Sequence, residues 1–137
     1  MKLNSDCLRD TLIAIEKLHR IFINDDGYLE KSVLWFDDLY SELPAYNKED
    51  VFYAIYNLDQ AKYINASIRW INACARDCAI NHMTYSGHEF LEEIRDDKRW
   101  KRIKGALSEI RDYSLSAINS VAKGMTSAAI AAYLSNG

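Results

Sequence analysis

Residues 47–70 read NKEDVFYAIYNLDQAKYINASIRW, and this stretch carries the strongest local signals in the chain. In its first half, apolar residues recur at three- and four-residue steps, as on one face of an α-helix: Val51, Ala54, Ile55, Leu58 and Ala61. Asn47, followed three residues later by Asp50, resembles a helix-capping pair. From Ile64 to Trp70 apolar and polar residues alternate, which is the two-residue period of a half-buried strand. The stretch therefore predicts a helix that leads directly into a strand.

The strand interpretation has a rival. Ile64, Ile68, Ile71 and Ala75 would also line one face of a helix. In the strand interpretation a second strand runs over residues 78–84, and the turn between the strands, Ala75-Arg76-Asp77, contains no glycine. Periodicity alone leaves residues 64–84 open between a hairpin and a helix.

Two further helices are predicted upstream. A short one covers residues 34–43 and ends before Pro44, because a proline disfavours the helical conformation of the residue that precedes it. This short helix, a tight turn and the longer helix give the outline of a helix-turn-helix. A first helix begins after Asn4 or Ser5, either of which can cap it, and ends before the turn at residues 24–27. Its apolar face contains Leu8, Leu12, Ile15 and Leu18.

Three helices are predicted downstream. Ser86, with Glu89 three residues later, has the pattern of a capping box at the start of the first. The second buries one face, and Ser114 caps the third. The buried face of the second contains Trp100, Ile103, Leu107 and Ile110. The chain is thus expected to form about six helices and one hairpin.

Composition places the chain among ordinary single-domain proteins. It has 137 residues, of which 49% are hydrophobic and 27% charged, and its net charge is -3. Three cysteines, and a start without the apolar run of a signal peptide, predict reduced thiols and a cytoplasmic location. The most apolar stretch, residues 124–134, is too short to cross a bilayer, so no membrane contact is expected.

Three motifs carry a family resemblance. They are the opening MKLN, the helix at residues 51–58, and above all TYSGHEFL at residues 84–91 with Ile94, Arg95 and Trp100 after it. Together they resemble an uncharacterised bacterial and phage family, domain of unknown function 2513, over roughly residues 1 to 110. The resemblance implies a winged helix of the kind found in prophages, and it implies no activity. Two features depart from the family pattern: Lys62 stands where a helix-ending glycine is usual, and residues 22–35 form a longer connection.

The expected fold is therefore mainly α with a small β-hairpin, in which a winged helix-turn-helix-like core is followed by C-terminal helices. Residues 1–97 are expected to form the winged-helix-like domain. Residues 98–137 are expected to form a helical extension packed on the same core.

A winged helix suggests DNA binding through its third helix and its wing. The helix over residues 48–62 opposes this use, because it carries two lysines against three acids. Residues 95–111 instead hold seven Lys or Arg against three acids, a net +4, which leaves -7 for the remaining chain. The candidate nucleic-acid-binding residues are Lys98, Arg99, Lys101, Arg102, Lys104, Lys48, Asn57, Arg69 and Arg76. The alternative for the basic segment is an ordinary solvent-exposed helix face.

Two functional hypotheses follow. The first is a phage or prophage protein that binds DNA as a regulator or accessory factor. The second is a protein-binding module of the same fold that modulates a host enzyme or defence system, because the third helix is aromatic and the remaining chain is acidic. Phe52, Tyr56 and Tyr63 are the candidate partner-binding residues. The alanine-rich last helix adds a homodimer as a further alternative.

No catalytic or metal-binding motif is recognised. Cys74, Cys78 and His82 are spaced by four residues, but no second pair of ligands follows at the distance that a structural zinc site needs. His88-Glu89 begins like a zinc-protease helix, yet Glu92 stands where the second histidine is required. We therefore predict a protein that is not an enzyme and that uses no metal and no cofactor.

Overall fold

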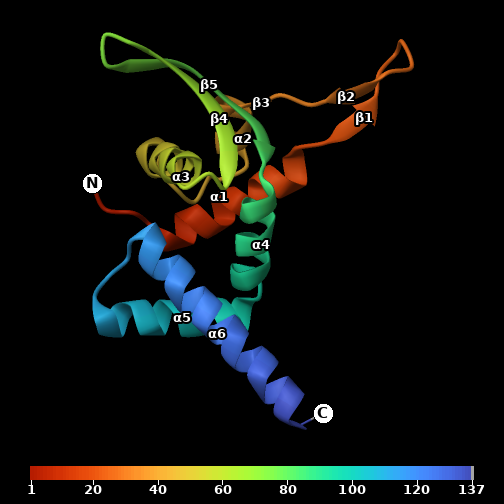
Figure 1. Cartoon of the computed structure of the whole chain (residues 1–137). Helices are drawn as coiled ribbons and strands as arrows, with labels where there is room; N and C mark the ends of the chain where they lie inside the picture. The colour runs from red at the N-terminus through yellow and green to blue at the C-terminus, as the bar shows by residue number, and fades with distance from the viewer. Residues whose placement is uncertain (137) are drawn as a thin grey trace.

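The computed structural model describes residues 1–136, with side chains through Ser135, and shows a mainly helical chain with small antiparallel sheets (Figure 1). This confirms the predicted fold class at that level. The helices are α1 (Ser5–Leu18), α2 (Phe36–Ser41), α3 (Lys48–Gln60), α4 (Tyr85–Ile94), α5 (Asp97–Ile110) and α6 (Leu115–Asn136). The strands are β1 (Ile21–Ile23), β2 (Leu29–Lys31), β3 (Leu34–Trp35), β4 (Ile64–Ile71) and β5 (Cys74–Met83).

Side-chain caps fix the starts of most helices. The side chains of Asn4, Asn47 and Ser114 accept hydrogen bonds from backbone N–H groups three residues later, as the sequence predicts. The predicted cap at Ser86 is wrong. Thr84 caps α4 instead, because its hydroxyl accepts the N–H of Gly87 at 3.1 Å while Ser86 lies exposed inside the helix.

Residues 64–83 form a long antiparallel hairpin, so the strand interpretation is confirmed over the helical one. Its pairing runs from Ile64 opposite Met83 to Ile71 opposite Cys74. The predicted turn at residues 75–77 is wrong, because these residues belong to β5, which begins at Cys74 and not at residue 78. The turn is Asn72-Ala73, and both residues adopt the positive φ that a tight two-residue hairpin turn requires.

The second helix is shorter than predicted. It begins at Phe36 because Leu34 and Trp35 form β3, which pairs with Ile80 and Ala79 of β5. The sheet therefore has the strand order β3-β5-β4. Pro44 follows the helix as expected, three residues after its last residue, Ser41.

A second hairpin, which the sequence analysis did not predict, occupies the long connection after α1. β1 pairs with β2, and the turn between them contains Gly27 at positive φ. We call residues 21–31 the arm; it extends away from the helices in Figure 1. Large apolar side chains on it are exposed, among them Ile21, Ile23, Tyr28 and Leu29. Exposure along both strands explains why no burial period marks the arm in the sequence.

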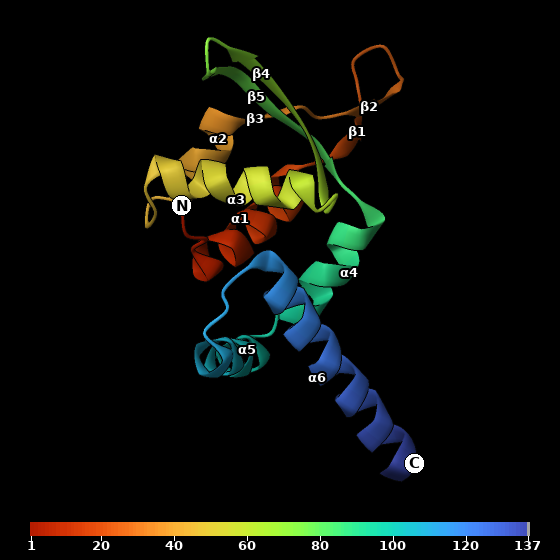
Figure 2. The ribbon, with the colours of Figure 1, turned by 60° about the vertical axis from the view of Figure 1, so that its left-hand side comes forward.

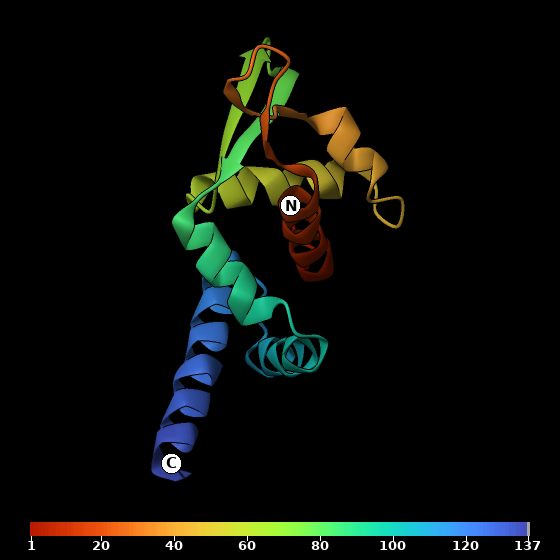
Figure 3. The ribbon, with the colours of Figure 1, turned by 90° about the vertical axis from the view of Figure 1, so that its right-hand side faces the viewer.

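One hydrophobic core joins the helices. Buried residues from α1, α3, α4, α5 and the first half of α6 form a single cluster. Figures 2 and 3 show α3 above α1 and α5 below it, with α4 descending from the sheet. The second half of α6 projects beyond the other helices in both views. The expected boundary between residues 97 and 98 stays a prediction; α5 and α6 share the core with the preceding helices.

The end of the long hairpin is held at Tyr63. The Tyr63 carbonyl accepts the backbone N–H of Thr84 at 3.0 Å, and Gly87 lies so close that an added Cβ would be 1.9 Å from the same oxygen. Lys62, at a position where the resemblance predicts a helix-ending glycine, adopts φ +63°, a conformation that costs a non-glycine residue free energy. The chain therefore turns from α3 into β4 as glycine would turn it.

We predict that Gly87→Ala lowers the free energy of unfolding by at least about 2 kcal/mol, because the backbone of Tyr63 cannot move without disturbing both β4 and α4. Gly105→Ala in α5 is the matched control. No atom lies within 4 Å of an added Cβ there, so this variant should gain about 0.5–1 kcal/mol. Urea denaturation measures both. Equal stabilities for the two variants would contradict the role of the close contact.

Candidate interaction surfaces

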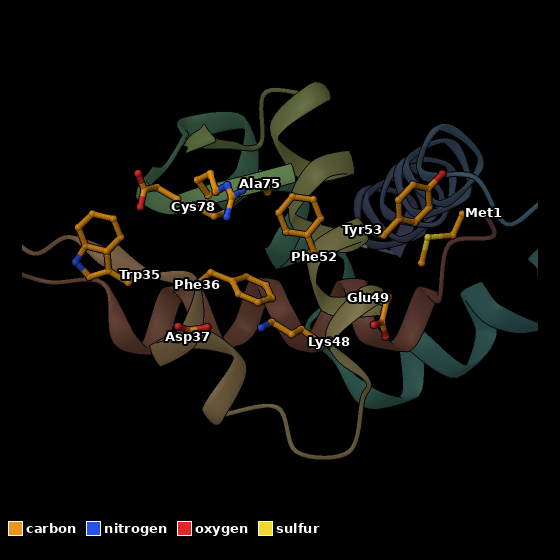
Figure 4. Close-up of a pocket in the computed structure, with 12 residues that line it drawn as sticks. Met1, Trp35, Phe36, Asp37, Lys48, Glu49, Phe52, Tyr53, Ala75 and Cys78 are labelled. Carbon is orange, nitrogen blue, oxygen red and sulfur yellow. The ribbon is translucent and has the colours of Figure 1, made fainter. Parts of the chain in front are cut away.

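A groove lies between the first half of β5 and the helices α2 and α3. Its volume is about 570 Å³. Figure 4 shows Ala75 and Cys78 of β5 on one side and Phe36 and Lys48 on the other. Trp35, half exposed, lies at the end where β3 stops. We refer to this feature as the groove; its lining also includes Asp37, Glu49, Phe52 and Arg76.

Aromatic rings form the wall and rim of the groove. Phe52 packs edge-on against Phe36 and against Trp70 of the long hairpin, with ring centroids 5.8 Å apart in each pair. Tyr56, one turn further along α3, is exposed, and its ring lines a shallow hollow beside Trp70. The structure thus brings two predicted partner-binding residues, Phe52 and Tyr56, to one surface and adds Trp35 and Trp70 to them.

Tyr63, the third predicted partner-binding residue, lies elsewhere. It follows α3 and stacks on Phe90 of α4, with ring centroids 4.7 Å apart. Its side chain is half-buried, and burial raises the pKa of its hydroxyl. Tyr63 therefore packs at the junction of α3 and α4 and does not share the surface of Phe52 and Tyr56.

The segment that contains α2 and α3 is acidic. Residues 36–62 hold six carboxylates and two lysines, a net -4. Lys48 lies over the Phe36 ring, with its Nζ 5.9 Å from the centroid, and Asn57 donates to the Tyr53 carbonyl at 2.8 Å. Two of the predicted nucleic-acid-binding residues on this side thus have intramolecular partners, and the charge around them is negative.

On the long hairpin, Arg69 and Arg76 differ. The Arg69 Nε donates to the Asp77 carboxylate at 2.7 Å across the two strands. Arg76 is exposed and lines the groove. The hairpin therefore presents one cation, Arg76, that has no ion pair among the described residues.

The basic segment is partly used for internal contacts. Arg95 donates to Glu16 of α1 at 2.9 Å, Lys104 is paired with Asp6 at 3.0 Å, and Arg99 lies 3.4 Å from the Thr126 hydroxyl of α6. Lys98, Lys101 and Arg102 are exposed and lack an ion pair within the described chain. We call these three residues the α5 cations; Arg111, which directly follows α5, is also exposed and has no ion pair in the described part of the chain.

The predicted nucleic-acid-binding residues therefore form two separate groups. In Figures 1 and 2, α1 lies between α3 and α5, so the α5 cations are on the far side of α1 from the groove. The sequence predicts one nucleic-acid ligand for both groups. The structure does not bring them onto one continuous surface.

The three cysteines form no disulfide in the structure and differ in exposure. Cys7 and Cys78 are buried, and burial raises the pKa of each thiol to about 11, whereas Cys74 is exposed at the start of β5. In residues 1–136 no three His, Cys, Asp or Glu side chains are grouped to hold a metal ion. No helix in the same range is long and apolar enough to span a bilayer. The expectations of a non-enzyme and of a cytoplasmic location stay predictions.

The fold and these surfaces define a small, mainly helical protein with two projecting hairpins, an aromatic groove and a partly paired basic helix. The chain belongs to the family of hypothetical proteins described as DUF2513, whose model matches residues 2–114. This confirms the resemblance inferred from the TYSGHEFL motif. No curated protein and no solved structure matches the chain. The matched range includes the groove and the α5 cations and ends just before α6.

The pairing of Glu16 with Arg95 makes stability depend on pH. Hydrogen bonds from Arg95 lower the pKa of Glu16, although burial opposes them. A carboxyl whose pKa is lower in the folded state stabilises the protein above its unfolded-state pKa, and this contribution is lost as pH falls through the folded pKa. Glu16→Gln should therefore reduce the loss of stability between about pH 5 and pH 3. Urea denaturation at a series of pH values measures how the free energy of unfolding changes with pH. Glu30→Gln on the exposed arm is the control. If the free energy of unfolding falls equally steeply with decreasing pH in both variants, the prediction is contradicted.

Proposed function

We propose that this protein is a winged-helix module that binds another protein through the groove beside α3. The element order α1-β3-α2-α3-β4-β5 supports the winged-helix part, because a helix, a strand, a helix-turn-helix and a hairpin follow one another in that order. The strand order β3-β5-β4 agrees with it, since the first strand joins the sheet beside the returning strand of the hairpin. In this arrangement β4 and β5 are the wing and α3 is the helix that would face a ligand.

The observation that carries the protein-binding part is the aromatic groove in an acidic setting. A helix that reads DNA needs cations near phosphates, and residues 36–62 are net -4. Protein interfaces, by contrast, are enriched in Trp, Tyr and Phe; Trp35 is exposed at the groove, and Trp70 and Tyr56 are exposed at the hollow beside it. Fold does not dictate function, so a winged helix can serve a protein partner. Modulation of a host enzyme or defence system by a phage-type protein is the role that we propose with it.

We predict that linear peptides selected against the purified protein from a phage-displayed random 12-residue library bind at the groove. Trp35→Ala should weaken the binding of such a peptide at least tenfold, because the half-exposed Trp35 ring would be buried by the peptide, and truncating a Trp that is buried in an interface costs about 2 kcal/mol or more. Isothermal titration calorimetry measures the affinities. Tyr85→Ala, an exposed aromatic on α4 outside the groove, is the matched control and should bind as the wild type does. Peptides insensitive to Trp35→Ala would contradict the proposal.

A second candidate function is nucleic-acid binding by the α5 cations. Lys98, Lys101 and Arg102 are spaced i, i+3 and i+4, so they share one helix face, and all three are exposed. Trp100, Ile103 and Leu107 occupy the buried face and fix the cations outward. Such a face suits phosphate contacts without base recognition. It would act independently of the groove, on the other side of α1.

If the α5 cations bind phosphates, a random-sequence DNA duplex should bind at low salt with a logarithmic salt slope of about -2 to -3, since each phosphate neutralised contributes about -0.9. Lys101→Glu combined with Arg102→Glu should abolish this binding. Arg20→Glu combined with Lys31→Glu makes the same charge change at exposed positions on and beside the arm and serves as the control. Fluorescence anisotropy measures both, and an equal loss in the two double variants would remove this candidate.

A further inference from the structure

β5 is paired unequally on its two sides. On one side β4 pairs with it from Met83 to Cys74, with an irregularity in the register at two points. On the other side β3 pairs only with Ile80 and Ala79, because the chain turns into α2 directly after Trp35. Alternate residues of a strand direct their N–H and C=O groups to opposite edges. Over residues 74–78, β5 therefore has an open edge, and no other strand among the described residues pairs with it.

The groove runs along this open edge. Residues 75–78 of β5 line one side of it, and Phe36 and Phe52 line the other (Figure 4). Trp35 lies where β3 ends, so the open edge begins where the existing pairing stops. The groove is thus a space beside the unpaired backbone of β5 and lies in line with β3. The exposed Trp35 side chain closes one end of it.

From this geometry we infer that the groove binds an extended segment of another protein, which adds a strand to β5 in line with β3 and antiparallel to β5. The inference rests on the proposed function and specifies its mode. A segment beside residues 74–78 would form a strand of about five residues, roughly 17 Å long. Backbone hydrogen bonds would supply affinity, and the side chains that face the aromatic wall would supply specificity.

A helical partner fits this site less well. A helix could cover Phe36 and Phe52, but its own N–H and C=O groups are already paired, so the open edge of β5 would lose water without gaining a partner. An unpaired backbone group that is buried in this way costs about 1–3 kcal/mol. Nucleic acid is disfavoured by the carboxylates of α2 and α3.

The irregularity at Arg76 limits the length of the added strand. Arg69 is opposite Asp77 and Trp70 is opposite Ala75, so Arg76 is an extra residue in β5 without a partner in β4. A bulge of this kind bends a strand and redirects its side chain. The Arg76 side chain lines the groove. The added strand is therefore expected to pair regularly with β5 over a short segment only.

Charge specifies the chemistry of the bound segment. Asp37 and Glu49 are exposed on the helical side of the groove, and neither has an ion pair in the described part of the chain. Lys48 on that side lies over the Phe36 ring. The residues of the added strand that face α2 and α3 are therefore expected to be an apolar or aromatic residue and, one alternation away, a lysine or arginine.

The experiment uses the full wild-type chain and a linear peptide selected from the random 12-residue library. Each backbone nitrogen of the peptide is methylated in turn, which removes one hydrogen-bond donor. Strand addition predicts that alternate positions lose at least tenfold in affinity while the positions between them change little. Hydrogen exchange measured by NMR should show slower exchange for amides within residues 74–78 and no change for Gly87 or Ser114.

The outcomes separate the two proposals. Binding that Trp35→Ala weakens, together with alternate sensitivity to methylation and protection of residues 74–78, supports strand addition. Binding that Trp35→Ala weakens, but with uniform or absent sensitivity to methylation, overturns strand addition and leaves the proposed function standing. A selected peptide that Trp35→Ala does not affect overturns both.

Discussion

The contact between Gly87 and the Tyr63 carbonyl determines how the two halves of this protein meet. At that point the chain leaves α3, enters β4, returns through β5 and starts α4. The Tyr63 carbonyl accepts the Thr84 N–H, the Thr84 hydroxyl donates to the Lys62 carbonyl at 2.7 Å, and the same hydroxyl caps α4. Only a residue without a side chain lets α4 begin this close to β4. The glycine in the family motif thus has a steric reason, and the long hairpin and α4 are positioned by one contact.

A second group of contacts, centred on Arg9, positions α5 relative to α1 and α4. Arg9 of α1 donates to the Ile94 carbonyl at 2.9 Å, to the Arg95 carbonyl and to Asp97 at 2.7 Å. The last carbonyls of a helix have no partner within it, so a side chain from α1 satisfies the end of α4. Trp100 lies beside Arg9 and donates its indole N–H to Asp6 at 2.8 Å. α5 therefore lies on α1 with its apolar face inward, which is why the α5 cations point to solvent on the side away from the groove.

Local signals in the sequence were sufficient for most helices and insufficient where the chain depends on distant contacts. Asn4, Asn47 and Ser114 could be identified as caps because a cap acts within three residues. Thr84 was missed because its hydrogen bonds to Lys62 and Gly87 require the hairpin to have closed first, and Ser86 offers the same local pattern. The turn at Asn72-Ala73 was misplaced because residues 74–77 are all exposed in β5, so no burial alternation marks them as part of a strand. The arm was not predicted because neither of its strands buries a face, so its sequence shows no alternation of apolar and polar residues.

The candidate sites are even harder to predict from local sequence signals than the fold. Both depend on contacts between residues that are distant in the sequence: the partner of each charged side chain, and the strand that pairs with each sheet edge. Counting charge over residues 95–111 gives a net +4, but Arg95 and Lys104 are paired with carboxylates of α1 and Arg99 contacts the Thr126 hydroxyl, so only part of that charge faces solvent unpaired. The open edge of β5 has no sequence signal at all. It exists because Trp35 is at once the last residue of β3 and the N-terminal cap residue of α2, which turns the chain away after two paired residues. A longer β3 would have covered residues 74–78 and removed the groove, so the shortness of one strand creates the surface on which the proposed function rests.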